Sequence, residues 1–126
     1  MPFELSKERF AELVERALAN VPPPFVGYLE EVAIEIRDRP SRKQLRSVGL
    51  KDDELLLGLY HGRPRDQRSV LDSGVMPDVI YLFQEDIEDA SDDEAELVEQ
   101  VRVTVLHEIG HHFGMDEDEL DALGYG

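Results

Sequence analysis

The strongest constraint on the fold is a long helical pattern near the carboxyl end of the chain. Apolar residues recur every three or four positions between residues 98 and 113, and Gly114 follows them. At about 100° per residue, these positions fall on one broad face of a helix, and a face of this kind is buried. The positions are Val98, Val101, Val105, Leu106, Ile109 and Phe113. The pattern therefore predicts one long helix that packs along this face and ends near Gly114.

The start of this helix is predicted from Ser91, which Asp92, Asp93 and Glu94 follow. A serine with a glutamate three positions later forms a capping box, in which each side chain accepts a hydrogen bond from the other residue's backbone amide. The three carboxylates also suit the positive end of the helix dipole. Because the oxygen-ligand spacing of an EF-hand is absent, we interpret these acids as a helix cap and not as a calcium site. The helix should begin at residue 91 or 92.

Shorter apolar patterns predict one more helix and a small sheet. Ser6 can cap a helix that runs to about residue 20, and three prolines at 22–24 end it. Apolar runs predict three strands, at residues 32–37, 55–60 and 79–84. The polar segments between them are predicted to be loops, the first with one helical turn. We expect a single α+β domain over residues 1–126.

Composition limits the chemistry and the partners. The chain has no cysteine, so any metal must be held by nitrogen and oxygen ligands, which means His, Asp and Glu. A formal net charge of −16 repels phosphate backbones and anionic lipid, and we expect neither nucleic acid nor membrane as a partner. The start of the chain lacks a signal-peptide pattern, and no apolar run approaches the roughly 20 residues of a membrane span. These features favour a cytoplasmic protein; they do not indicate an oligomeric state.

Two histidines in the long helix stand apart from its apolar face. His107 and His111 are one turn apart, about 40° from each other around the axis, so their rings can converge on one point. Glu108 follows His107 directly in the sequence. His112 falls among the apolar positions, and we interpret it as a hydrogen-bonded core histidine instead of a ligand. The stretch HEIGHHFGMDEDEL therefore predicts a zinc site, although a solvated helix end is the alternative.

A catalytic zinc site uses three protein ligands and leaves a position for water, so two histidines are not sufficient. Gly114 lets the chain leave the helix, and the acidic residues 116–119 follow at once, so a third ligand could come from this turn. In the HExxH arrangement the glutamate is the general base for the metal-bound water. The reaction that this chemistry predicts is hydrolysis of an amide.

The stretch HEIGHHFGMDEDEL resembles the HExxHxxGxx(D/E) signature of the small bacterial minimal zincins, often labelled zincin-like metallopeptidases. Two further segments, GLYHGRPRDQRS at 58–69 and MPDVIYLFQEDIE at 76–88, are also similar to segments of that family, and the resemblance covers roughly residues 25–123. It implies an α+β zincin core with a short sheet packed on the active-site helix. Together with the N-terminal helix predicted above, we therefore expect a minimal zincin-like α+β fold with a sheet of about three strands on the long active-site helix and a short C-terminal helix. The resemblance also implies Zn²⁺ and peptidase activity.

Carried over from the family, His107 and His111 are the two ligand histidines and Glu108 is the general base. The third ligand position, ten residues after the first histidine, is Glu117. Related zincins have histidine or aspartate at this position, so Glu117 departs from the pattern in the length of its side chain. Asp116 stays open as the alternative third ligand, since either carboxylate can bind zinc.

The resemblance also suggests where a peptide would lie. In zincins an extended substrate pairs with an edge strand beside the metal, and the candidate is LLLGLYHG at 55–62. Tyr60, His61, Arg63 or Tyr81 could stabilise the oxyanion of the transition state, although packing is the simpler role for both tyrosines. The net charge suggests a mild preference for basic peptides.

Two functions remain open from the sequence. The first is a zinc-dependent peptidase that acts on a peptide or protein substrate through a water activated by Glu108. The second is a non-catalytic zincin-fold binding or scaffold protein with a structural or vestigial metal site, because little chain is left to build a substrate cleft. The intact Glu108 favours the first, since a scaffold needs ligands and has no use for a base.

Overall fold

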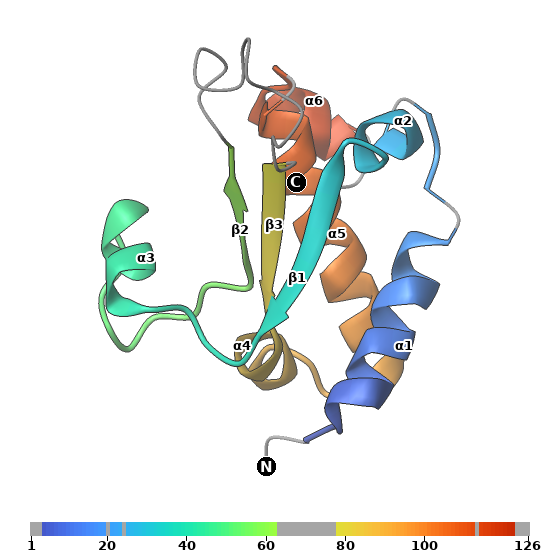
Figure 1. Cartoon of the computed structure of the whole chain (residues 1–126). Coiled ribbons are helices and arrows are strands. Elements are labelled where there is room, and N and C mark those ends of the chain that lie inside the picture. Colours follow the sequence, from blue (N-terminus) through green and yellow to red (C-terminus); the bar gives the residue numbers. More distant parts are fainter. Residues whose placement is uncertain (1–3, 20, 24, 63–77, 113, 123–126) are drawn as a thin grey trace, which may run out of the picture.

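The computed structural model describes residues 4–19, 21–23, 25–62, 78–112 and 114–122. The elements in chain order are α1 (Lys7–Leu18), α2 (Phe25–Leu29), β1 (Val32–Arg37), α3 (Arg42–Ser47), β2 (Gly58–His61), β3 (Asp78–Phe83), α4 (Gln84–Asp89), α5 (Glu94–His112) and α6 (Glu117–Ala122). A three-stranded sheet packs on the long helix α5, and α1 lies along the same helix (Figure 1). This arrangement confirms the predicted α+β, minimal zincin-like fold.

The strand order is β1-β3-β2, with β1 parallel and β2 antiparallel to β3. Because side chains alternate along a strand, the register divides the sheet into two faces. One face packs on α5 and carries isoleucine and leucine from β1 and β3, with Gly58 and Tyr60 of β2 level with them. The other face carries Arg37, Tyr81 and, from β2, Leu59 and His61. β2 is an edge strand among the described strands.

The core lies between α1, α5 and the first of these faces. Ser6 caps α1 by accepting a hydrogen bond from the Arg9 amide at 3.0 Å, as the sequence predicted. The fully buried side chains of this core include Phe10, Leu13, Ile80, Leu82, Val101, Val105, Leu106 and Ile109. The predicted apolar face of the long helix is thus buried along most of its length, although Phe113 lies outside the described residues. None of the described helices is long and apolar enough to cross a membrane.

Most predicted elements are confirmed, and the departures concern β2, α2, α4 and the start of α5. β2 covers only Gly58–His61, so residues 55–57 precede the strand. The helices α2 and α4 were not predicted, because each has too few residues to show a helical period in the sequence. The predicted loop at 62–78 lies almost wholly outside the described residues.

The start of α5 also differs from the prediction. The helix begins at Glu94, and Ser91 is buried with its hydroxyl donating to the Ile87 carbonyl at 2.8 Å. Asp93 takes the capping role instead, since its carboxylate accepts a hydrogen bond from the Glu96 amide at 2.7 Å. The Glu96 carboxylate in turn accepts one from the Asp92 amide at 3.0 Å. The physical reason for the shift is that α4, which was not expected, ends just before Ser91 and takes up its hydroxyl.

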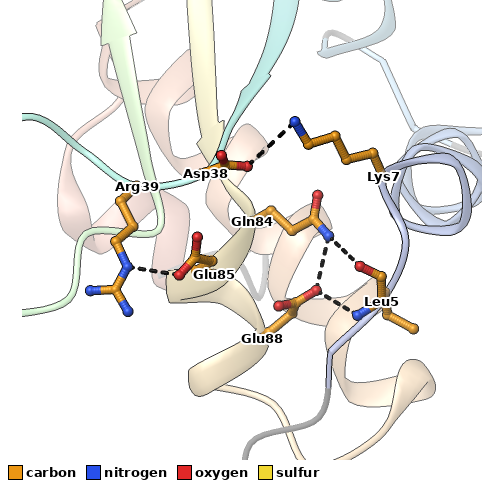
Figure 2. A network of polar contacts seen from close by, with 7 residues as sticks. All are labelled: Leu5, Lys7, Asp38, Arg39, Gln84, Glu85 and Glu88. Carbon is orange, nitrogen blue, oxygen red and sulfur yellow. Dashed lines mark hydrogen bonds and ion pairs between the residues drawn. The ribbon is translucent and has the colours of Figure 1, made fainter.

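A polar network joins α4 to the amino-terminal segment (Figure 2). The Glu88 carboxylate accepts hydrogen bonds from the Leu5 amide and from Gln84 Nε2, both at 3.0 Å. Gln84 Nε2 also donates to the Leu5 carbonyl at 2.9 Å. Nearby, Arg39 Nε donates to Glu85 at 2.8 Å. Because Gln84 and Glu88 are both buried, this network fixes Leu5 against α4.

Candidate active site

The carboxyl end of α5 carries the predicted pair of histidines. Leu106 and Ile109 face the core and are fully buried, whereas His107 is half-buried and His111 is exposed. The two imidazole rings lie side by side, with centroids 4.5 Å apart and planes at 78°. This is the geometry expected from residues one helical turn apart on the side of the helix that does not pack on the core.

Glu108, the predicted general base, reaches the edge strand. Its Oε1 accepts a hydrogen bond from the Tyr60 amide at 3.0 Å. The Phe83 amide donates a hydrogen bond to the Leu57 carbonyl. Because backbone amides alternate in direction along an antiparallel strand, the amides of Leu59 and His61 point toward β3. The Tyr60 amide, which lies between them, points toward the outer edge of β2. Glu108 therefore occupies a donor on the outer edge of β2, a contact that the sequence did not indicate.

A glycine allows β2 to approach α5 closely enough for this contact. A Cβ added at Gly58 would lie 2.6 Å from Thr104 Cγ2 and 3.1 Å from the Tyr81 carbonyl oxygen. A side chain at this position would force either Thr104 or the strand to shift. Gly58 thus sets the distance between the strand that carries Tyr60 and the helix that carries Glu108.

A second cluster adjoins the histidine pair and includes Asp78, which sequence reasoning missed. The Tyr60 hydroxyl donates to Asp78 Oδ2 at 2.8 Å, and the Tyr60 ring stacks on His112 with centroids 4.0 Å apart. His112 Nε2 lies 3.6 Å from the same Asp78 oxygen. Asp78 is buried, at 6% exposure, and its place at the start of an apolar strand was its only signal in the sequence.

The prediction that His112 is a core histidine is wrong. Its side chain is 29% exposed, because the last turn of α5 runs past the core and lies against Tyr60 at the sheet edge. Of the four candidates for oxyanion stabilisation, only Tyr60 is described on the face of the sheet that packs on α5. His61 and Tyr81 are on the other face, and Arg63 is outside the described residues.

The turn after α5 leads to α6, and the two candidate third ligands lie at the start of α6. Gly114 has φ +93°. The Met115 amide donates to the Gly110 carbonyl, and the Gly114 amide donates to the His111 carbonyl. This left-handed glycine and the two hydrogen bonds form a Schellman motif. Asp116 then caps α6, since its carboxylate accepts a hydrogen bond from the Glu119 amide at 2.8 Å.

Glu117 is the first residue of α6, and its side chain is outside the described part. Among the side chains that are described, no three His, Asp or Glu residues come together as a metal site. The structure thus places two imidazoles and the glutamate of the motif, and it leaves the third ligand as a prediction. The turn is fixed by Leu120, which is fully buried against Gly110, where a Cβ would lie 2.5 Å from Leu120 Cδ2.

Comparison with known proteins places this arrangement in context. A family model described as zincin-like metallopeptidase matches residues 29–126, which include the sheet, α5 and α6. The chain is also similar to a solved structure, a conserved hypothetical protein from Thermus thermophilus, with 24% sequence identity and a TM-score of 0.54. The similarity covers 94% of this chain and 97% of the other, and it concerns the fold. No curated protein matches the chain.

Proposed function

Because the chain belongs to the family of zincin-like metallopeptidases, we propose that it is a zinc-dependent peptidase with its site at the end of α5. The observation that carries the proposal is the placement of His107 and His111. Their rings are 4.5 Å apart and off the buried face, and Glu108 lies between them in sequence and reaches the edge of the sheet. Membership of the family supports zinc as the usual cofactor.

The residues present fit a zinc ion. Imidazole nitrogens and carboxylate oxygens are the ligands that zinc accepts when no thiolate is available, and this chain has no cysteine. His107 and His111 would supply two of them. Glu117, or Asp116 in its place, would supply the third from the start of α6. A bound zinc lowers the pKa of its water to about 7 and polarises a carbonyl.

Glu108 would act as the general base, accepting a proton from the attacking water and returning it to the leaving amine. Its carboxylate accepts a hydrogen bond from the Tyr60 amide, which is the outward donor of the edge strand. A peptide that pairs with β2 would use this same donor. Substrate binding would therefore release Glu108 from Tyr60 and make its carboxylate available for proton transfer.

The alternative is a non-catalytic binding or scaffold protein. One observation favours it: the hydrogen bond from Tyr60 to Glu108 fastens the edge strand to the helix, and this role would preserve the glutamate without catalysis. The two functions differ in turnover. A peptidase cleaves peptides in a metal-dependent way, whereas a scaffold with a structural metal shows no cleavage above a metal-free control.

The deciding experiment measures zinc per chain by metal mass spectrometry, in protein purified without chelator. We expect close to one zinc in the unmodified chain and almost none in His111→Ala. His112→Ala is the matched control, because it removes the adjacent imidazole and is expected to keep the metal. A peptide-library screen of the unmodified protein, with and without chelator, then tests turnover.

Two outcomes would overturn the proposal. If neither the unmodified chain nor His111→Ala holds zinc after zinc is added and washed away, there is no such site. If zinc is bound but no peptide is cleaved above the chelated control, the scaffold function replaces the peptidase.

A further inference from the structure

A hollow of about 590 Å³ lies on the face of the sheet that α5 does not cover. Three cationic side chains line it, with His61 and Leu59 of the edge strand and Tyr81 of β3 between them. The cations are Arg37 at the end of β1, Arg39 just after it, and Lys43 on α3. The described lining contains no Asp or Glu.

The positive charge of this hollow contrasts with the rest of the chain. Asp and Glu outnumber Lys and Arg by 29 to 13 overall, yet six of those 13 cations lie between residues 37 and 51, beside a single acid, Asp38. The net charge concealed this local excess. Over distances shorter than the Debye length of about 8–10 Å, the nearby charges determine what a ligand meets.

Two of these three cations form ion pairs within the chain. Arg39 pairs with Glu85 through Nε, and its two terminal nitrogens take no part in that hydrogen bond (Figure 2). Arg37 pairs with Glu35 at 3.2 Å, and its guanidinium lies 5.3 Å from the centre of the Tyr81 ring. Both ion pairs are exposed, and exposed pairs add little to stability, so a carboxylate of a ligand can compete for these cations at small cost. Within the described part of the chain, Lys43 has no ion pair.

The hollow and the candidate active site are joined by one strand. A peptide paired with the outer edge of β2 would alternate its side chains between the two faces of the sheet. Side chains on one face would lie toward α5, where His107 and Glu108 are. The alternate side chains would lie on the face of Leu59 and His61, where the hollow opens.

We propose that this hollow binds acidic side chains of the peptide that pairs with β2, so that the protein prefers acidic peptide substrates. The proposal rests on the peptidase function for the site at α5. It reverses the mild preference for basic peptides expected from the net charge.

The lining suits a peptide better than other anions. Guanidinium groups bind carboxylates with two parallel hydrogen bonds, and Leu59 and Tyr81 offer apolar surface for the stem of a glutamate. A nucleic acid would carry many phosphates across the strongly negative remainder of the surface, which would repel it. A single acidic side chain enters only the local positive field.

Peptide binding can be measured separately from cleavage with full-length zinc-loaded Glu108→Gln, followed by fluorescence anisotropy. Three labelled peptides of equal length carry Glu, Gln or Lys at alternate positions. We expect the Glu peptide to bind about tenfold more tightly than the Gln peptide at low salt. Lys43→Glu should abolish this ratio and favour the Lys peptide. Lys51→Glu is the matched control, because it makes the same change in net charge within the same basic segment but outside the hollow.

Three results would overturn the inference: equal binding of the Glu and Gln peptides, an equal effect of Lys51→Glu and Lys43→Glu, or displacement of the Glu peptide by free succinate at matched concentration. The last would make the hollow a site for small anions. Failure of the peptidase proposal would instead appear in the measurements of zinc content and peptide turnover. The two failures are therefore distinguishable.

Discussion

Two carboxylates hold the two ends of the same edge segment, and they do so in different surroundings. Asp86 Oδ2 accepts a hydrogen bond from the Leu56 amide just before β2, and Glu108 Oε1 accepts one from the Tyr60 amide within it, both at 3.0 Å. Asp86 is buried, at 4% exposure, whereas Glu108 is half-buried beside the His107 and His111 rings. The same kind of hydrogen bond to a backbone amide thus has a structural role at Asp86 and belongs to the candidate active site at Glu108.

The largest expected difference between the two ends is catalytic. Glu108→Gln keeps an oxygen that can accept the Tyr60 amide but removes the base, so we expect peptide hydrolysis to fall by about 10²–10⁴-fold. Zinc content and thermal midpoint should stay close to those of the unmodified protein. Asp86→Asn is the matched control and should leave turnover unchanged. Equal loss of activity in both variants would mean that the glutamate acts through the strand and not as a base.

Truncation is expected to affect stability in the opposite order. Asp86→Ala removes a buried side chain and leaves the half-buried Leu56 amide without its acceptor, which should lower the free energy of unfolding by about 1–3 kcal/mol. Glu108→Ala should cost less, because water can reach the half-buried end of the strand and replace the carboxylate. Urea unfolding of both variants measures the difference. A larger loss for Glu108→Ala would show that the hydrogen bond beside the histidines is the stronger one.

The sequence predicted the elements with strong periodicity or clear stops. The long helix, the N-terminal helix and the first and third predicted strands, which form β1 and β3, follow from apolar spacing, prolines and Ser6, and their positions depend on local chemistry. The short helices α2 and α4 have no period to detect. Ser91 shows the limit of cap recognition, since its hydroxyl serves the preceding helix once α4 exists.

The site was predicted as far as one helix determines it. His107, Glu108 and His111 are placed by the geometry of α5, so their relative positions follow from spacing alone. The contacts of Tyr60 with Glu108 and Asp78 depend on which strand lies at the edge, which no local pattern shows. His112 was misplaced for the same reason: the pattern gives the side of the helix but not where the core ends.

The approach of β2 to α5 can be altered at one glycine. Gly58→Ala places a methyl group against Thr104, and we expect a loss of about 1–2 kcal/mol in stability and faster hydrogen exchange at the Tyr60 amide. Thr104→Ser removes the Cγ2 methyl that the added methyl group would meet. In combination with Gly58→Ala it should restore much of both properties. Unchanged exchange at Tyr60 in the single variant would mean that the contact with Glu108 does not depend on this spacing.

The smallest expected effect is the dependence of stability on pH that comes from the buried Asp86. Burial raises the pKa of Asp86, and the hydrogen bond from Leu56 only partly opposes this. The folded protein therefore binds the proton more tightly than the unfolded chain, so this group lowers stability as pH rises from the ordinary aspartate range through the raised pKa. Asp86→Asn keeps an acceptor for Leu56 and removes the charge, so it should raise the urea midpoint slightly at pH 7 and lose that gain near about pH 3.5. If Asp86→Asn is less stable at pH 7, the charged hydrogen bond outweighs the cost of burial, and the two ends of β2 are held alike.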